Sequence, residues 1–208
     1  MNNRNNDKIS IPDGNDPLNP VRIYSDGVYD CFHYGHARSL EQVKKSFKYV
    51  YLIVGVPSDE DTIREKGKIL MTEVERAECV SHCKWVDEIL HNCPWNKTFE
   101  FLEKYDIHYV AHDPLPYKCG DIDDLYGKFK DVGRFIPIKR TEGISTTDLI
   151  ARVIKDFDEF TLRSLQRGTD LKELKLDKTI SFIIDYLKKD NTEYSENLLK
   201  YIVKKLNN

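Results

Sequence analysis

The sequence predicts an α/β fold, a Rossmann-like five-stranded parallel sheet flanked by helices, with a C-terminal helical extension. Short apolar runs alternate with amphipathic segments of helical period from Val21 to about Phe157. This alternation is typical of parallel strands joined by right-handed crossovers. Beyond that point only helical periodicity remains. We therefore expect a flexible leader over residues 1–20, a main domain over 21–157 and a helical extension over 158–208.

The individual elements follow from hydrophobic period and capping signals. The expected strands are Val21–Ser25, Tyr49–Val56, Val86–Leu90, Tyr109–Ala111 and Phe135–Ile138. Five helices are expected. The first contains Ala37, Leu40, Val43 and Phe47, and the second runs from Thr72 to about Cys83. The others are Phe99–Lys104, Asp123–Lys130 and a helix that follows Ser145. Thr72 and Glu75 have the spacing of a capping box. The polar stretch Asp59–Lys68 is expected to be a loop.

The composition describes a globular chain with no general electrostatic case for binding nucleic acid. Hydrophobic residues make up 40% and charged residues 32% of the 208, and the formal net charge is −3. No apolar run approaches the length of a membrane span, and the first twenty residues lack the apolar core of a signal peptide. Five cysteines, an odd number, predict reduced thiols and a cytoplasmic or nuclear location.

Several cysteines and histidines lie close together in the middle of the sequence, which raises the question of a zinc site. They are Cys79, His82, Cys83, His91 and Cys93. No CxxC pair is present, and the first three fall within an expected helix. Buried free thiols are therefore favoured over a structural zinc site.

The segment DGVYDCFHYGH, from Asp26 to His36, connects the first strand to the first helix. Backbone N–H groups and the helix dipole favour an anion at such a helix start. His33 and His36 are three residues apart, so we expect both imidazoles to share a helix face and to converge on one phosphate. By itself the pattern also fits two ordinary histidines at a helix start.

A second motif, RTEGISTTD, begins at Arg140 and follows the fifth strand. Arginine offers a planar fork for phosphate oxygens. Gly143 permits a turn that brings Ser145 and Thr146 to a helix N-terminus, where hydroxyl and N–H groups can bind phosphate. The alternative is an ordinary N-cap after a surface arginine. Both motifs follow strands, and parallel sheets bind ligands beyond the carboxyl ends of their strands.

Together these motifs resemble the cytidylyltransferase family of the HxGH nucleotidyltransferase superfamily, and within it the choline-phosphate cytidylyltransferases. The similarity runs from about Val21 to Leu176 and includes YLIVGV, WVDE, CPW, VAHD and LQRG. The resemblance implies transfer of the cytidylyl group of CTP to phosphocholine, giving CDP-choline and pyrophosphate, with Mg²⁺ accompanying CTP. A phosphate monoester is itself a nucleophile, so no covalent intermediate is required, and catalysis rests on positioning and charge stabilisation.

The resemblance also implies a role for each phosphate-binding residue. His33 and His36 would hold the triphosphate, and Arg140 the leaving phosphates. Gly35, Ser145 and Thr146 would complete the phosphate site. Lys66 would reach the α-phosphate from a mobile loop, although Lys68 is equally available from the residues alone.

The choline pocket follows partly from physical chemistry. A quaternary ammonium donates no hydrogen bonds and is held best by aromatic faces with one carboxylate. The resemblance places Trp95, Tyr117 and Tyr126 around choline, with Asp26 supplying charge. It also implies that His112 orients the phosphate of phosphocholine, beside Asp113. Pro114 stands where the family commonly has a second aspartate.

The resemblance further implies a homodimer, which forms through the Val86–Glu88 segment, although Lys84 replaces the usual arginine. Between Asp170 and Asn208 the numbers of Lys and of Asp/Glu residues are nearly equal, which favours packing of these helices on the main domain or on a second subunit. Association with a membrane surface would need a segment that is not evident here. The rival functions are cytidylyl transfer to phosphoethanolamine or glycerol 3-phosphate, and an inactive nucleotide-binding regulatory module. Phosphoethanolamine enzymes usually carry tandem domains, and one set of motifs is present here.

Overall fold

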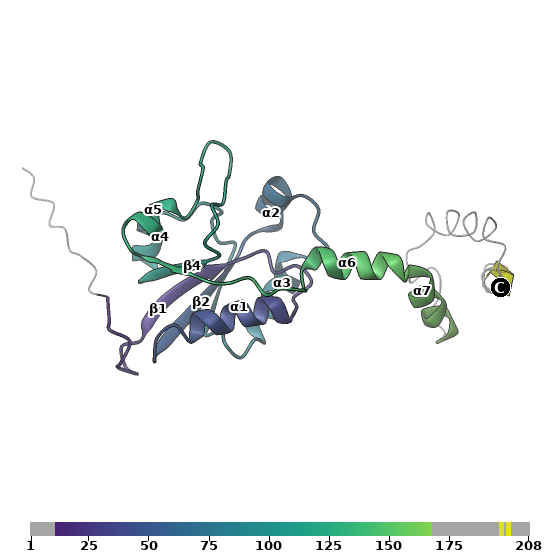
Figure 1. Cartoon of the computed structure of the whole chain (residues 1–208), viewed down its shortest axis with the longest axis horizontal. Helices are drawn as coiled ribbons and strands as arrows, with labels where there is room; N and C mark the ends of the chain where they lie inside the picture. The colour runs from purple at the N-terminus through teal and green to yellow at the C-terminus, as the bar shows by residue number, and fades with distance from the viewer. Residues whose placement is uncertain (1–10, 168–195, 198, 201–208) are drawn as a thin grey trace, which may run out of the picture. The chain divides into compact units, whose positions relative to one another are not determined.

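The computed structural model describes residues 11–167, 196–197 and 199–200. The chain divides into two compact units, Met1–Thr146 and Thr147–Asn208, and the first holds the sheet (Figure 1). Residues 11–20 contain no helix or strand. Within this segment the Gly14 carbonyl accepts a hydrogen bond from Tyr49 N at 3.0 Å. The expected flexibility of the leader stays a prediction.

The sheet confirms the expected fold. Its strands are β1 (Val21–Asp26), β2 (Val50–Val56), β3 (Glu88–His91), β4 (Tyr109–His112) and β5 (Phe135–Pro137), in the order β3-β2-β1-β4-β5. All four pairings are parallel. The carboxyl ends of β1 and β4 therefore meet at one edge of the sheet, and ligands bind at such an edge in this architecture.

Helices cover both faces of the sheet, because successive strand residues point to opposite sides. The helices of the first unit are α1 (Tyr34–Lys44), α2 (Asp59–Lys66), α3 (Glu73–Ser81), α4 (Phe99–Lys104) and α5 (Gly127–Asp131). Side chains of α1 and α3 pack with Ile23 in one buried cluster, whereas α4 and α5 pack with Tyr24 in the other. In Figure 1, α1 accordingly lies on one side of the strands and α4 and α5 on the other.

Two predictions about secondary structure were wrong. The stretch Asp59–Lys68, expected as a loop, contains α2. Ser58 caps this helix by accepting from Asp61 N at 3.1 Å, and acidic residues in the first turn oppose basic residues in the last. The helix expected over Asp123–Lys130 begins only at Gly127, because the Asp124 carboxylate binds nearby backbone N–H groups and holds a turn.

The second unit contains α7 (Phe157–Gln166) and most of α6 (Thr146–Lys155), which starts directly after Ser145, as expected. Residues 168–195, 198 and 201–208 of the expected extension lie outside the described residues. In the part of the chain that is described, every helix is too short or too polar to cross a membrane.

Candidate active site

The two histidines of the HxGH segment lie face to face at the start of α1. Their ring centroids are 3.8 Å apart and the ring planes differ by 16°. We expected His33 to lie on the helix, but it is the N-cap residue that precedes it. The pair forms a reciprocal capping box, in which each side chain accepts from the backbone N–H of the other residue. The rings thus converge through capping rather than through a shared helix face.

The capping box determines which ring nitrogen carries the proton. His33 Nδ1 accepts from Gly35 N at 3.1 Å and from His36 N at 3.4 Å. His36 Nδ1 accepts from His33 N at 3.3 Å. Neutral imidazole has one N–H, so in both rings it belongs to Nε2. Among the described residues, His33 Nε2 is buried and lacks a hydrogen-bond partner, so this donor is not used by the chain itself.

Burial also keeps these imidazoles uncharged. Desolvation lowers the pKa of His33. The pKa of His36 falls to about 4, first through burial and then through the neighbouring His33 and Arg140. At neutral pH the two rings therefore act as neutral hydrogen-bond donors, and a bound polyanion would favour their protonated form.

Gly35 lacks a side chain because the space is taken. A Cβ at this position would lie 2.8 Å from Ile144 Cγ2 and 2.9 Å from the His33 ring. Ile144 belongs to the RTEGISTTD segment, so this close approach packs the second phosphate motif against the first.

The buried side chain of Arg76, which the sequence analysis did not single out, supports the segment that carries the HxGH motif. Arg76 on α3 is fully buried, and its guanidinium donates to the carbonyls of Val28 (2.8 Å), Pro57 (2.9 Å) and Met71 (3.2 Å). It also pairs with Asp59 at the start of α2, at 2.8 Å. One side chain thereby joins the HxGH segment, the end of β2 and the start of α2. A buried arginine of this kind leaves no sequence signal apart from its place on a helix.

The second motif reaches the same region through Thr146 and Arg140. The Thr146 hydroxyl donates to the Asp30 carbonyl at 2.9 Å. Ser145 precedes α6 directly. Arg140 has an 80% exposed side chain whose Nε lies 3.8 Å from Asp113 Oδ2. Arg140 is near enough to lower the pKa of His36, and Asp113, directly after β4, lies beside Arg140.

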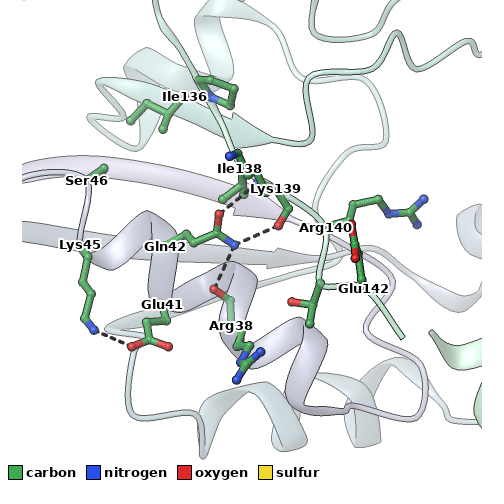
Figure 2. A pocket seen from close by; sticks show the side chains of 12 residues that line it. Arg38, Glu41, Gln42, Lys45, Ser46, Ile136, Ile138, Lys139, Arg140 and Glu142 are labelled. Carbon is green, nitrogen blue, oxygen red and sulfur yellow. Dashed lines mark hydrogen bonds and ion pairs between the residues drawn. The ribbon is translucent and has the colours of Figure 1, made fainter. Parts of the chain in front are cut away.

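A groove of about 830 Å³ runs between α1 and residues 136–142. The Gln42 amide holds its two walls together, because it donates to the Lys139 carbonyl at 2.9 Å and accepts from Lys139 N at 3.1 Å. Figure 2 shows that the Arg140 guanidinium points away from Gln42. Arg140 therefore lines the groove while its guanidinium lies near the Asp113 carboxylate.

The residues predicted to bind choline gather beyond the ends of β1 and β4. The His112 ring stacks on Tyr126 at 4.4 Å between centroids and meets Tyr117 edge-on at 5.8 Å. Trp95 packs against the same apolar cluster. Asp26 Oδ1 accepts from the Tyr126 hydroxyl at 3.0 Å. Five of the six side chains that the resemblance assigned to phosphocholine are thus in one neighbourhood, and the sixth, Asp113, follows His112 directly.

Two lysines enter this neighbourhood. Lys66, at the end of α2, holds its ammonium 4.6 Å from the centre of the Tyr117 ring. This places Lys66 beside the aromatic cluster, on a helix and not on the loop we expected. Lys97, which the sequence analysis did not single out, pairs with Asp26 Oδ2. A lysine in a polar CPWNKT stretch carries no sequence signal of burial.

The other candidate groups have local partners. All five cysteines are free thiols, and in the described ranges no three or more His, Cys, Asp or Glu side chains could hold a metal ion. In the Val86–Glu88 segment, the Asp87 carboxylate binds Lys44 and accepts from Leu52 N at 2.6 Å. Glu88 lies 3.7 Å from Arg22. The predicted homodimer stays a prediction.

Comparisons with known proteins show the family of the chain. The Cytidylyltransferase-like family matches residues 24–152. The chain is 56% identical over 164 residues to a probable choline-phosphate cytidylyltransferase of Schizosaccharomyces pombe, covering 78% of this chain and 45% of the relative. It is 52% identical to choline-phosphate cytidylyltransferase 2 of Arabidopsis thaliana, over 80% of this chain and 56% of the relative.

A third relative is choline-phosphate cytidylyltransferase A of Homo sapiens, 51% identical over 79% of this chain and 44% of the relative. An ethanolamine-phosphate cytidylyltransferase of Arabidopsis thaliana is 40% identical over 65% of this chain. The chain spans about half the length of the curated choline-phosphate relatives it matches. The matched residues contain the sheet and both phosphate motifs, and the chain belongs to the cytidylyltransferase-like family.

Proposed function

We propose that this chain transfers the cytidylyl group of CTP to phosphocholine, releasing pyrophosphate and forming CDP-choline for phosphatidylcholine biosynthesis. One observation carries the proposal: a single segment holds the stacked histidines at its end and, at its start, Asp26 within an aromatic cluster. An anion site and a cation site are thereby adjacent. The names of the relatives that are 51–56% identical support the same substrates.

The proposed chemistry is a single in-line displacement. A phosphocholine oxygen attacks the α-phosphorus of CTP, that P–O bond forms, and the bond to pyrophosphate breaks. The Nε2–H groups of His33 and His36 would donate to the phosphate oxygens, on which negative charge builds up. Arg140 would hold the leaving phosphates, with Ser145 and Thr146 at the start of α6. Such preorganised donors act without the solvent reorganisation that water would require.

Lys66 would serve the α-phosphate from the end of α2. Its ammonium lies over Tyr117, within the cluster proposed to hold the attacking substrate. This position favours Lys66 over Lys68, which stands beyond the end of the helix at Gly67.

A Mg²⁺ ion that arrives with CTP would be held by the nucleotide phosphates and water, and not by the residues named for the anion site. Mg²⁺ prefers oxygen ligands and keeps several waters, and it binds commonly through substrate phosphates. The donors at this site are N–H groups and cations. When bound, the metal would neutralise triphosphate charge. The chain's own part is to hold the remaining phosphate oxygens.

A comparison of substrates tests the proposal. Steady-state turnover of CTP is measured with phosphocholine, phosphoethanolamine and glycerol 3-phosphate as acceptors. We expect the highest kcat/KM for phosphocholine, because aromatic faces suit a cation without N–H donors. A higher value for either of the other acceptors would reject the choline assignment, and CTP binding without turnover would favour a regulatory module.

A further inference from the structure

The buried side chain of Lys97 forms an ion pair with Asp26, the carboxylate proposed to bind the choline head group. Lys97 lies between β3 and α4, with a side chain that is 5% exposed, and that of Asp26 is 12% exposed. The Lys97 ammonium donates to Asp26 Oδ2 and, at 3.0 Å, to the Trp95 carbonyl. Lysine is almost never buried this deeply without a partner. The ion pair is therefore an integral part of the pocket.

The pair changes the electrostatics of the pocket. Asp26 Oδ1 accepts from the Tyr126 hydroxyl, so both carboxylate oxygens have partners within the chain. The Lys97 ammonium also lies 5.9 Å from the centre of the Tyr24 ring. A trimethylammonium that enters the aromatic cluster meets a neutralised carboxylate and a like charge beside it. Charge–charge terms are several times larger in such partly buried surroundings than in water.

We propose that Lys97 is a specificity-determining residue. Its ammonium competes with the cationic head of the alcohol phosphate for Asp26, and it weakens the binding of cationic alcohol phosphates relative to uncharged ones. The nucleotide product carries the same head, so the competition also speeds product release. This inference rests on the proposed function, because it requires an alcohol phosphate bound beside Asp26.

Replacing the lysine by a neutral side chain of similar length tests the competition. Calorimetric affinities for phosphocholine and glycerol 3-phosphate are measured for the wild type, Lys97→Met and Lys128→Met. Lys128 is the matched control, since it donates to Asn96 on the same loop at 3.0 Å and does not pair with Asp26. We expect Lys97→Met to bind phosphocholine about tenfold more tightly, a change of about 1.4 kcal/mol. Affinity for glycerol 3-phosphate, and both affinities of Lys128→Met, should stay at the wild-type level.

Two outcomes overturn the proposal: an unchanged affinity for phosphocholine, or equal losses for both ligands, which would mean that Lys97 binds the phosphate. Removing one member of a buried ion pair can also unfold a protein. Asp26→Asn is therefore compared with Asp26→Asn/Lys97→Met, in which no carboxylate remains to compete for. A gain well below tenfold is expected, because only the like charge of the lysine is then removed, and a full tenfold gain in this background contradicts the competition.

The experiments distinguish a failure of the role proposed for Lys97 from a failure of the proposed function. A wild-type chain that makes CDP-choline normally, combined with an unaltered Lys97→Met, rejects only the role of Lys97. A wild-type chain that neither binds phosphocholine nor turns it over rejects the proposed function, and with it the role of Lys97.

Discussion

The guanidinium of Arg76 donates to the Val28 carbonyl at 2.8 Å, and this contact ties α3 to the segment that presents His33 and His36. The same side chain holds the end of β2 and the first residue of α2. The geometry of the proposed anion site thus depends on a residue that would not itself touch a substrate.

Replacing Arg76 by lysine should destabilise the fold. Lysine cannot reach four acceptors with one ammonium, so buried carbonyls lose their donors. We expect the free energy of unfolding in urea to fall by about 3 kcal/mol or more. Arg64→Lys is the control, because Arg64 pairs with Asp61 on an exposed surface, where such pairs contribute about 1 kcal/mol or less. Equal effects of the two variants would contradict the role of Arg76.

Removing the His36 ring should slow catalysis more than it weakens substrate binding. His36→Ala removes an N–H donor at the transferring phosphate, and the loss of one preorganised donor lowers kcat by about 10²-fold or more. His82→Ala, at a position 76% exposed on the far end of α3, should turn over at the wild-type rate. If His36→Ala keeps its kcat, the assignment of His36 is wrong.

The protonation of His36 can be followed by NMR. The pKa of this buried imidazole is about 4, below the ordinary value of about 6.5. The ring should therefore stay neutral as the pH is lowered from 8 to 5.5. Since the unfolded chain binds a proton at higher pH than the folded chain, this group lowers the folding stability as the pH falls from about 6.5 toward about 4. Titration of the His36 Cε1 signal near 6.5 would show that the ring is solvated.

The lysine at the α-phosphate can be identified by a matched pair of variants. Both Lys66 and Lys68 are exposed, so neither exchange should affect folding. Lys66→Met should lower kcat by about 10²-fold, the typical loss for one electrostatic stabiliser, whereas Lys68→Met should keep the wild-type rate. The reverse order would assign the role to Lys68.

Sequence periodicity was sufficient for the sheet, because β2 is a nearly continuous apolar run and β1 carries apolar residues at Val21, Ile23 and Tyr24. The capping signal likewise located α3, since Thr72 and Glu75 form the expected capping box. It failed for α2, whose stability comes from caps and charges and not from an apolar stripe. The motifs drew attention to the two segments that pack together through Gly35 and Ile144. They could not reveal Arg76 or Lys97, since burial of a cation depends on acceptors far away in the sequence, such as Val28 and Asp26.

The most direct test of the account is to follow the products of CTP and phosphocholine by ³¹P NMR with Mg²⁺ present. The account predicts CDP-choline and pyrophosphate in equal amounts, formed by the wild-type chain and suppressed in His36→Ala. Resonances of CTP and phosphocholine that remain unchanged, or CTP hydrolysis to CMP without CDP-choline, would contradict it.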